Sequence, residues 1–288
     1  MVGRDRGEAL ASPRASAPAA IAIVGVGLIG TSIALAWRRL HPHAVVVGVD
    51  NADVIRHPRV FETLSCASTD LAAVADAEII VLAAPVGAIV DLLPSIAEIA
   101  PAALVLDTGS TKRAILDAAR SARLTRFVGG HPMAGSDRSG PDAARADLFD
   151  ARSWFVIGRA PAAFEAGTFV RQLGATPIFM NDDGSEHDRV MAAVSHLPQV
   201  VATALMARVG ETVGRDGLAH AGTGLRDTTR VAGSEARVWE SVLATNADSV
   251  RPLLLQLSED LERLAGQLDD PAAIRRLFGL ANMYRKNL

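Results

Sequence analysis

The chain contains little cysteine, few aromatic side chains and no excess of charge of either sign. Among its 288 residues there is one cysteine, Cys66, and aromatic residues make up 4% of the composition. A single cysteine excludes an intrachain disulfide and favours a reducing compartment. The 29 basic and 32 acidic side chains leave a net charge of −3, whereas nucleic-acid-binding domains are normally strongly basic. We therefore expect a cytoplasmic protein that does not bind nucleic acid.

Long hydrophobic runs are missing as well. The longest extends from Ile79 to Val90, between Glu78 and Asp91, and is shorter than the roughly 20 residues that a bilayer span needs. Residues 1–18 are rich in alanine, arginine, serine and proline but lack the apolar core of a signal peptide. We expect no membrane segment, and a flexible tail over residues 1–18.

Two kinds of periodicity divide the chain. Up to about residue 180, short apolar runs alternate with amphipathic stretches of helix length, and from Asp182 onward the pattern is almost entirely helical. The first pattern indicates βαβ units, whose parallel sheet is covered on both faces. We predict the α/β class, with a doubly wound (Rossmann) parallel-sheet domain over residues 19–180 and an all-α helical domain over residues 181–288. The predicted strands are Ala20–Val24, Ala44–Val49, Ile79–Ala83, Leu104–Leu106, Phe127–Val128 and Trp154–Ile157.

The helical half carries two further signals. Pro198 lies inside a helical stretch that begins near Ser185, and its missing N–H predicts a kink there. Near the C-terminus, six apolar residues are spaced 4, 3, 4, 3 and 4 apart, a stripe that packs against another helix of the same chain or of a second subunit. We expect a homodimer formed mainly by residues beyond about 180. The stripe consists of Val250, Leu254, Leu257, Leu261, Leu264 and Leu268.

A glycine-rich turn follows the first predicted strand directly and precedes a helix-forming stretch. Its sequence is Gly25-Val26-Gly27-Leu28-Ile29-Gly30. Gly25 permits the tight turn, Gly27 lets a pyrophosphate approach the backbone, and Gly30 lets helix and strand pack closely. The N-terminus of the following helix offers free N–H groups to phosphates. This context predicts a dinucleotide site.

Asp50 follows the second predicted strand, 20 residues beyond Gly30. A carboxylate there accepts hydrogen bonds from the adenosine ribose and repels a 2′-phosphate, so the sequence favours NAD over NADP. The alternative is a solvated Asp50 in a tight turn.

Ligands of a doubly wound sheet bind outside the carboxyl ends of the strands, so four loops should meet at one edge. This topology singles out Ser110 and His131, although Ser110 can instead cap the following helix. A catalytic zinc site usually needs three protein ligands, and no such set is evident, so we expect no metal. The four loops are 25–30, Ala84-Pro85-Val86, residues 107–112 and residues 129–135.

The run Gly129-Gly130-His131-Pro132-Met133-Ala134-Gly135-Ser136-Asp137-Arg138-Ser139-Gly140 resembles the signature of the prephenate dehydrogenase family. Further segments agree in order and spacing, and together they span roughly residues 20 to 245. These segments are Asp107-Thr108-Gly109-Ser110-Thr111-Lys112, Glu186-His187-Asp188, Ser195-His196-Leu197-Pro198, Arg226-Asp227-Thr228-Thr229-Arg230 and Trp239.

The resemblance implies an NAD-dependent oxidative decarboxylation of prephenate to 4-hydroxyphenylpyruvate, a step of tyrosine biosynthesis. It implies that His131 is the base acting on the ring C4 hydroxyl and that Ser110 hydrogen-bonds the same hydroxyl. Arg230 resembles the anchor of the side-chain carboxylate, although it can instead pair with Asp227.

The resemblance also places His196 in the substrate pocket and His187, Asp188 and Trp239 in a polar network around it, with Trp239 reaching across a dimer interface. Asp137 departs from the glutamate that many relatives carry, which puts any gating contact of that residue in doubt.

Three other functions stay open. Arogenate differs from prephenate by an amino group in place of a keto group, and we prefer prephenate because no acidic residue is evidently placed for an ammonium. A different two-domain β-hydroxyacid or imine dehydrogenase explains the glycine-rich turn but not Ser110, His131, His196 and Arg230 together. A non-catalytic NAD-binding sensor needs none of these residues.

Overall fold

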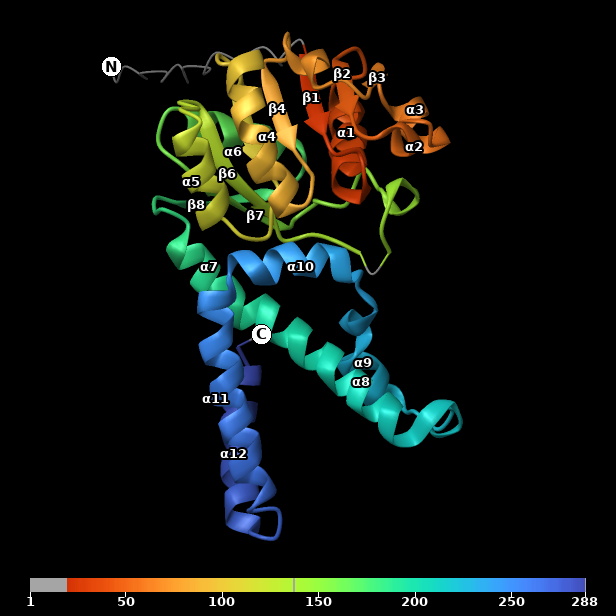
Figure 1. Cartoon of the computed structure of the whole chain (residues 1–288), viewed down its shortest axis with the longest axis vertical. Coiled ribbons are helices and arrows are strands. Elements are labelled where there is room, and N and C mark those ends of the chain that lie inside the picture. The colour runs from red at the N-terminus through yellow and green to blue at the C-terminus, as the bar shows by residue number, and fades with distance from the viewer. Residues whose placement is uncertain (1–19, 137, 288) are drawn as a thin grey trace, which may run out of the picture.

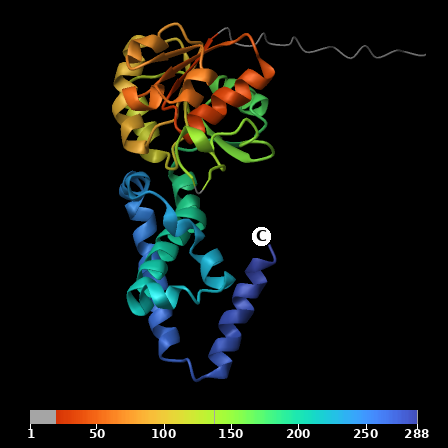
Figure 2. The same ribbon diagram turned by 90° about the vertical axis from the view of Figure 1, so that its right-hand side faces the viewer.

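A computed structural model describes residues 20–136 and 138–287 (Figure 1). The predicted tail over residues 1–18 and the substituted position Asp137 lie outside the described residues. A layered α/β body occupies one end of the molecule, and the helices of the second half extend away from it (Figures 1 and 2).

An eight-stranded sheet forms the centre of the first half, in the order β3-β2-β1-β4-β5-β6-β7-β8. Neighbouring strands are parallel except for β6 and β7, which are antiparallel. The predicted α/β class is therefore confirmed, with one antiparallel pair that the sequence did not indicate. The strands are β1 (Ala20–Val24), β2 (Val45–Val49), β3 (Cys66–Ser68), β4 (Ile79–Leu82), β5 (Leu104–Asp107), β6 (Phe127–Pro132), β7 (Ser153–Ile157) and β8 (Thr176–Met180).

Helices cover both faces of this sheet and enclose two apolar clusters. One cluster packs α1 and α6 against one face, and the other packs α4 and α5 against the opposite face. Because both faces are buried, β4 and β5 are apolar almost throughout, as expected for central parallel strands. The helices are α1 (Leu28–Leu40), α2 (Ala52–Ile55), α3 (Pro58–Thr63), α4 (Val86–Ile99), α5 (Arg113–Ser121) and α6 (Ala162–Gln172), with short 3₁₀ turns η1 (Leu71–Val74) and η2 (Pro141–Ala143).

Three features of the sheet differ from the sequence prediction. β3 is short and half-exposed and lacks the apolar run that marked the others, whereas β8 has an apolar run but contains Pro177, which argues against a strand, and is largely exposed. β6 continues through His131 to Pro132, because its last four residues pair with β7. His131 therefore lies on a strand rather than in a loop.

The second half is helical throughout its described residues. The regular helix is interrupted by a π-helical segment, η3, immediately before Pro198, so that the wider turn accommodates the residue that lacks an N–H. The predicted irregularity is thus present as a π segment that ends at His196. The elements are α7 (Ser185–Met191), η3 (Ala192–His196), α8 (Leu197–Leu218), α9 (Thr223–Thr228), η4 (Arg230–Gly233), α10 (Ala236–Thr245), α11 (Ala247–Ala265) and α12 (Pro271–Arg285).

The stretch 185–218 is, by length and composition alone, apolar enough to cross a bilayer, although polar side chains interrupt its apolar residues. Only 28% of its most apolar window is buried in the single chain. The stretch is interrupted by η3 and by a non-helical backbone at Gly214, and its first turns pack against α5. These are features of a helix that packs within a protein.

The apolar stripe of α11 becomes more exposed with distance from the α/β body. Val250 is 3% exposed, whereas Leu261 is 55% and Leu268 is 69% exposed. α11 and α12 project from the rest of the molecule, as Figure 2 shows. The outer end of the stripe therefore lacks a covering partner within the described residues.

Candidate active site

The glycine-rich turn between β1 and α1 has the backbone that its sequence predicts. Gly25 has a φ of +94°, and a Cβ there would lie 2.5 Å from the carbonyl oxygen of Ala83. Gly27 precedes α1 directly, and a Cβ there would meet nothing within 4 Å, so this side of the turn is open. Leu28, Ile29 and Gly30 form the first turn of α1, whose N–H groups face the same edge.

Asp50 lies beside this turn at the carboxyl end of β2. Its Oδ2 accepts a hydrogen bond of 2.8 Å from the backbone N of Val26, and its Oδ1 accepts one of 2.7 Å from the backbone N of Asn51. The carboxylate is thus held next to the turn by the backbone. Ala84 and Pro85 follow β4 and lead into α4 at the neighbouring position of the same edge.

A hollow of about 950 Å³ opens at the opposite edge, lined chiefly by residues 75–79 and 99–104 before β4 and β5. Ligands of doubly wound sheets bind at the carboxyl ends of the strands. The cofactor edge is therefore the one that carries Gly25, Gly27 and Asp50.

The loop after β5 joins the two halves of the protein. α5 begins at Arg113 without a side-chain cap of its own, so Ser110 does not cap it. Instead, the carboxylate of Asp188 on α7 accepts hydrogen bonds from the backbone N of Lys112 (2.7 Å) and of Arg113 (3.0 Å). A carboxylate at a helix N-terminus is favoured by the helix dipole and by the free N–H groups.

Gly184 allows this docking. It has a φ of +92°, and a Cβ there would lie 2.7 Å from the backbone N of Arg113. α7 therefore approaches the start of α5 more closely than any other residue type would allow.

A buried ion pair lies under the same loop. Lys112 and Asp107 are both 0% exposed, and the Lys112 ammonium donates to the Asp107 carboxylate and, over 2.6 Å, to the carbonyl oxygen of Gly130. Asp107 also accepts hydrogen bonds from the backbone N of Gly109 (2.8 Å) and of Gly130 (3.0 Å). This pair fixes β5 against β6 one residue before His131. Burial lowers the pKa of Lys112, and the Asp107 carboxylate opposes that effect.

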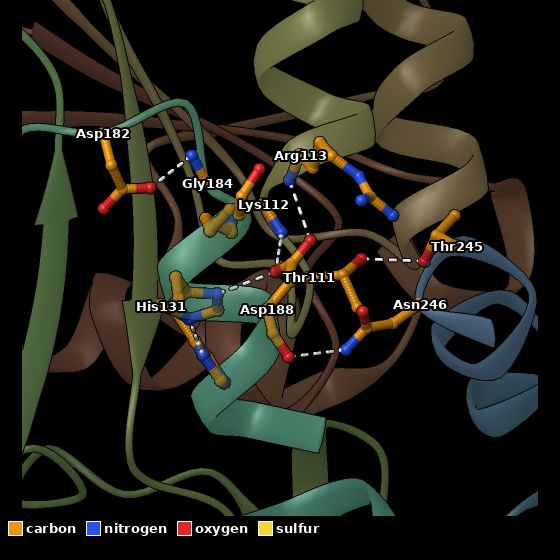
Figure 3. A network of polar contacts seen from close by, with 12 residues as sticks. Thr111, Lys112, Arg113, His131, Asp182, Gly184, Asp188, Thr245 and Asn246 are labelled. Atoms are coloured by element: carbon orange, nitrogen blue, oxygen red, sulfur yellow. Dashed lines mark hydrogen bonds and ion pairs between the residues drawn. The ribbon is translucent and has the colours of Figure 1, made fainter. Parts of the chain in front are cut away.

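His131 is 9% exposed and forms the first member of a chain of polar contacts (Figure 3). Its Nδ1 lies 2.9 Å from Nε2 of His187, and Nδ1 of His187 lies 2.8 Å from Oδ1 of Asp188. The Phe155 ring packs against both imidazoles. No hydrogen bond to Nε2 of His131, or to the Ser110 hydroxyl, forms within the described part of the chain. Both groups are thus available to a ligand.

His196 is fully buried at the end of η3. Its Nδ1 lies 3.1 Å from the amide Nδ2 of Asn246, which also donates a hydrogen bond of 2.8 Å to the backbone carbonyl oxygen of Asp188. The Trp239 ring of α10 stands edge-on to the imidazole at 5.9 Å. The resemblance suggested that Trp239 reaches across a dimer interface, whereas in the single chain it packs against its own His196.

Burial keeps these histidines uncharged. It lowers the pKa of His131 well below its ordinary value, and the nearby His187 and Lys112 lower it further. It also lowers the pKa of His187, although the hydrogen bond to Asp188 opposes this change. The pKa of His196 is lowered to about 4, again chiefly by burial. His131 is therefore a neutral imidazole at neutral pH.

Arg230 begins η4 and is exposed. The pairing with Asp227 that the sequence left open is not formed, and Arg230 makes no ion pair with any described residue. The backbone carbonyl of the adjacent Val231 accepts a hydrogen bond of 2.8 Å from Gln199, one turn beyond His196. η4 therefore packs on the part of α8 next to the buried histidine.

Sequence reasoning did not assign a role to Lys112, Asp107 or Asn246. Lys112 and Asp107 were quoted within a motif, and a lysine five residues after an aspartate gives no sign of a buried pair. Asn246 sits at the junction of α10 and α11, where an asparagine is ordinary. Among the described residues, no group of histidine, cysteine and acidic side chains could hold a metal ion.

A glycine-rich turn with an adjacent carboxylate, and neutral histidines brought to the same edge from both halves, define a two-domain nucleotide-dependent dehydrogenase. Family profiles agree: residues 33–160 match "Prephenate dehydrogenase, nucleotide-binding domain" and residues 183–276 match "Prephenate dehydrogenase, dimerization domain". The chain is 32% identical to a prephenate dehydrogenase of Lactococcus lactis subsp. cremoris over 90% of this chain and 74% of that one. The chain belongs to the prephenate dehydrogenase family.

Two solved structures are also similar. The first is the prephenate dehydrogenase of Aquifex aeolicus in complex with hydroxyphenyl propionate and NAD⁺, with a TM-score of 0.83 and 25% identity over 93% of this chain and 96% of that one. The second is the arogenate dehydrogenase of Synechocystis, with a TM-score of 0.74 and 26% identity over 93% of this chain and 99% of that one. The expected fold and family are thus confirmed by sequence and by structure.

Proposed function

We propose that the protein catalyses the NAD-dependent oxidative decarboxylation of prephenate to 4-hydroxyphenylpyruvate, a step of tyrosine biosynthesis. The observation that carries this proposal is the neutral, buried His131 at the cofactor edge, held through Nδ1 by His187 with Nε2 left free. A base of this kind suits a substrate whose hydroxyl must lose a proton as the carbon beneath it is oxidised.

The chain's own residues account for the proton. Nε2 of His131 accepts the proton of the C4 hydroxyl, and the Ser110 hydroxyl hydrogen-bonds the same oxygen. The electrons of the O–H bond form a C4=O double bond as the hydride leaves C4. The C1 carboxylate then leaves as carbon dioxide, and its bonding electrons pass through the ring to this carbonyl oxygen, which becomes a phenolate. His131 then returns the proton to that oxygen. Proton transfer to a placed histidine typically contributes roughly 10²–10⁴-fold to the rate.

The residues of the first half fit NAD. The open side of Gly27 leaves room for a pyrophosphate, and the first turn of α1 offers it N–H groups. Asp50, Ala84 and Pro85 flank the remainder of the dinucleotide, with Asp50 accepting from the ribose hydroxyls. When bound, NAD accepts the hydride that leaves C4. Residues 19–180 thus form the cofactor domain.

Residues 181–288 supply the substrate side and the subunit contact. The unpaired guanidinium of Arg230 is the anchor for the side-chain carboxylate, and His196, His187 and Trp239 line the pocket nearby. The exposed leucines at the outer end of the stripe, Leu261 and Leu268, and the match of this half to a dimerization domain support a homodimer. We place the protein in the cytoplasm.

Arogenate is the second candidate substrate, because an arogenate dehydrogenase shares the fold. The test is a measurement of kcat/KM for prephenate and for arogenate, each with NAD and with NADP. Prephenate with NAD should give the highest value. A higher kcat/KM for arogenate would identify the protein as an arogenate dehydrogenase of the same family. If the protein binds NAD but reduces it with neither substrate, it is a sensor or acts on a different hydroxyacid.

A further inference from the structure

Asp188 holds two of the pocket histidines by two different groups. Its carboxylate contacts His187, which in turn contacts His131. Its backbone carbonyl contacts Asn246 (Figure 3), which in turn contacts His196. Each imidazole of the pocket is therefore held through Nδ1, but by a partner of opposite hydrogen-bonding character.

The hydrogen-bond partners of His131 determine which of its ring nitrogens carries the proton. The Asp188 carboxylate can only accept hydrogen bonds, and it already accepts from the backbone N–H groups of Lys112 and Arg113, so Nδ1 of His187 must donate to it. In a neutral His187 the other ring nitrogen, Nε2, then has only a lone pair. Nδ1 of His131 must therefore donate to His187, which leaves Nε2 of His131 unprotonated.

For His196 the same reasoning gives the opposite result. The backbone oxygen of Asp188 accepts only, so the atom of Asn246 that faces it is the amide nitrogen. That nitrogen also lies 3.1 Å from Nδ1 of His196, so Nδ1 accepts. The proton of a neutral His196 then resides on Nε2, which is buried and has no partner among the described residues.

We propose that Asp188 fixes the two pocket histidines in opposite tautomers, through His187 and Asn246 as positioning residues. His131 presents a lone pair on Nε2, and His196 presents an N–H on Nε2. The lowered pKa values of both imidazoles support neutral rings at neutral pH.

The proposal extends the proposed function and rests on it for the use of each tautomer. The lone pair of His131 takes the hydroxyl proton, whereas the N–H of His196 donates to an acceptor oxygen of the bound anion. A buried donor without a partner is costly, which favours a ligand that brings such an oxygen. His187 therefore acts on the chemical step, and Asn246 acts on binding.

Nitrogen-15 NMR of the full chain tests the tautomers directly. The protein has seven histidines, so ¹⁵N-histidine labelling and long-range ¹H–¹⁵N correlation at pH 7.5, without substrate, gives a resolvable set. His131→Asn and His196→Asn assign the two rings. We expect Nδ1 to be protonated in His131 and Nε2 in His196. Protonation of Nε2 in His131, or of Nδ1 in His196, overturns the proposal.

Variants separate the two positioning residues. His187→Leu removes the acceptor for Nδ1 of His131 and should lower kcat at least tenfold with little change in KM, whereas His187→Gln keeps an acceptor oxygen and should restore most of the rate. Asn246→Leu should raise KM severalfold and leave kcat nearly unchanged. Thr245→Val, at the neighbouring position, loses its bonds to Thr111 and to the backbone oxygens of α10 but contacts neither Asp188 nor His196, and it serves as the control.

These experiments distinguish a failure of the tautomer proposal from a failure of the proposed function. The wild-type spectrum needs neither a folded variant nor a substrate, so it decides the tautomers even if His187→Leu does not fold. Expected tautomers without prephenate turnover leave the proposal standing and remove the proposed function. Turnover with equal effects of His187→Leu and His187→Gln removes the positioning role of His187.

Discussion

Replacing Lys112 by methionine tests how the buried ion pair supports the site. Methionine has a similar length and no charge, so the substitution leaves the Asp107 carboxylate in a fully buried place with only the backbone N–H groups of Gly109 and Gly130. Removing one partner of a buried pair typically costs about 3–5 kcal/mol, because the remaining charge stays desolvated. For a protein of this size, that cost corresponds to a fall in Tm of roughly 10 °C.

The neighbouring residue provides a matched control. Arg113 pairs with Asp248 at 2.6 Å, but the two side chains are 34% and 60% exposed. Exposed pairs are worth about 0–1 kcal/mol, so Arg113→Met should shift the unfolding midpoint only slightly. The backbone N–H that Asp188 caps is present in both variants. Urea unfolding of the two variants side by side measures the difference.

Lys112→Met should also change the pH dependence of the reaction. Lys112 lowers the pKa of His131, so its removal should raise that pKa. The base must be neutral to act, and activity is therefore lost as pH falls through its pKa. The acidic limb of kcat/KM should move to higher pH in Lys112→Met and stay in place in Arg113→Met. Equal stabilities of the two variants, with unmoved limbs, would refute the reasoning.

Three further predictions concern other site residues, and a fourth concerns the apolar stripe. We expect the wild type to prefer NAD over NADP by at least about tenfold in kcat/KM, or about 1.4 kcal/mol, and Asp50→Ala should reduce this preference. Equal use of both cofactors by the wild type would contradict the role of Asp50. His131→Asn should lower kcat by roughly 10²-fold or more and abolish an acidic limb that lies below pH 6.5 in the wild type, while NAD affinity measured by calorimetry stays unchanged. Arg230→Ala should weaken substrate binding by roughly 2–3 kcal/mol, seen mostly as a higher KM. An unchanged KM in a folded variant would mean that another residue anchors the carboxylate. Leu261→Glu should convert the dimer to monomers, as measured by sedimentation at micromolar concentration. A wild type that is monomeric and fully active under these conditions would refute the proposed homodimer.

Parts of the fold could be predicted from the sequence where a physical requirement produces a local pattern of residues. The central strands are buried on both faces and are therefore apolar runs, and the turn of Gly25 needs a residue without a Cβ. The edge strand β3 is short and lacks that pattern, and the apolar run of β8 contains Pro177, which argues against a strand, so both appear only in the structure. The extension of β6 through His131 depends on pairing with β7, a contact between distant segments.

The site divides in the same way. His131 and Ser110 could be predicted, because topology brings the carboxyl ends of parallel strands together. The role of Asp188 as the cap of α5 depends on Gly184 bringing α7 within reach, and the role of Asn246 depends on the π segment that places His196 beside it. Such contacts join residues that are 50 or more positions apart, and they leave no periodic trace in the sequence.

The stoichiometry of one reaction tests the central claim most directly. The wild-type protein is incubated with NAD and prephenate, and NADH, carbon dioxide and 4-hydroxyphenylpyruvate are quantified together, with His131→Asn as the control. We predict equal amounts of all three products from the wild type and a rate at least about 10²-fold lower from the variant. NADH without carbon dioxide, or NAD binding without any NADH, would contradict the assignment.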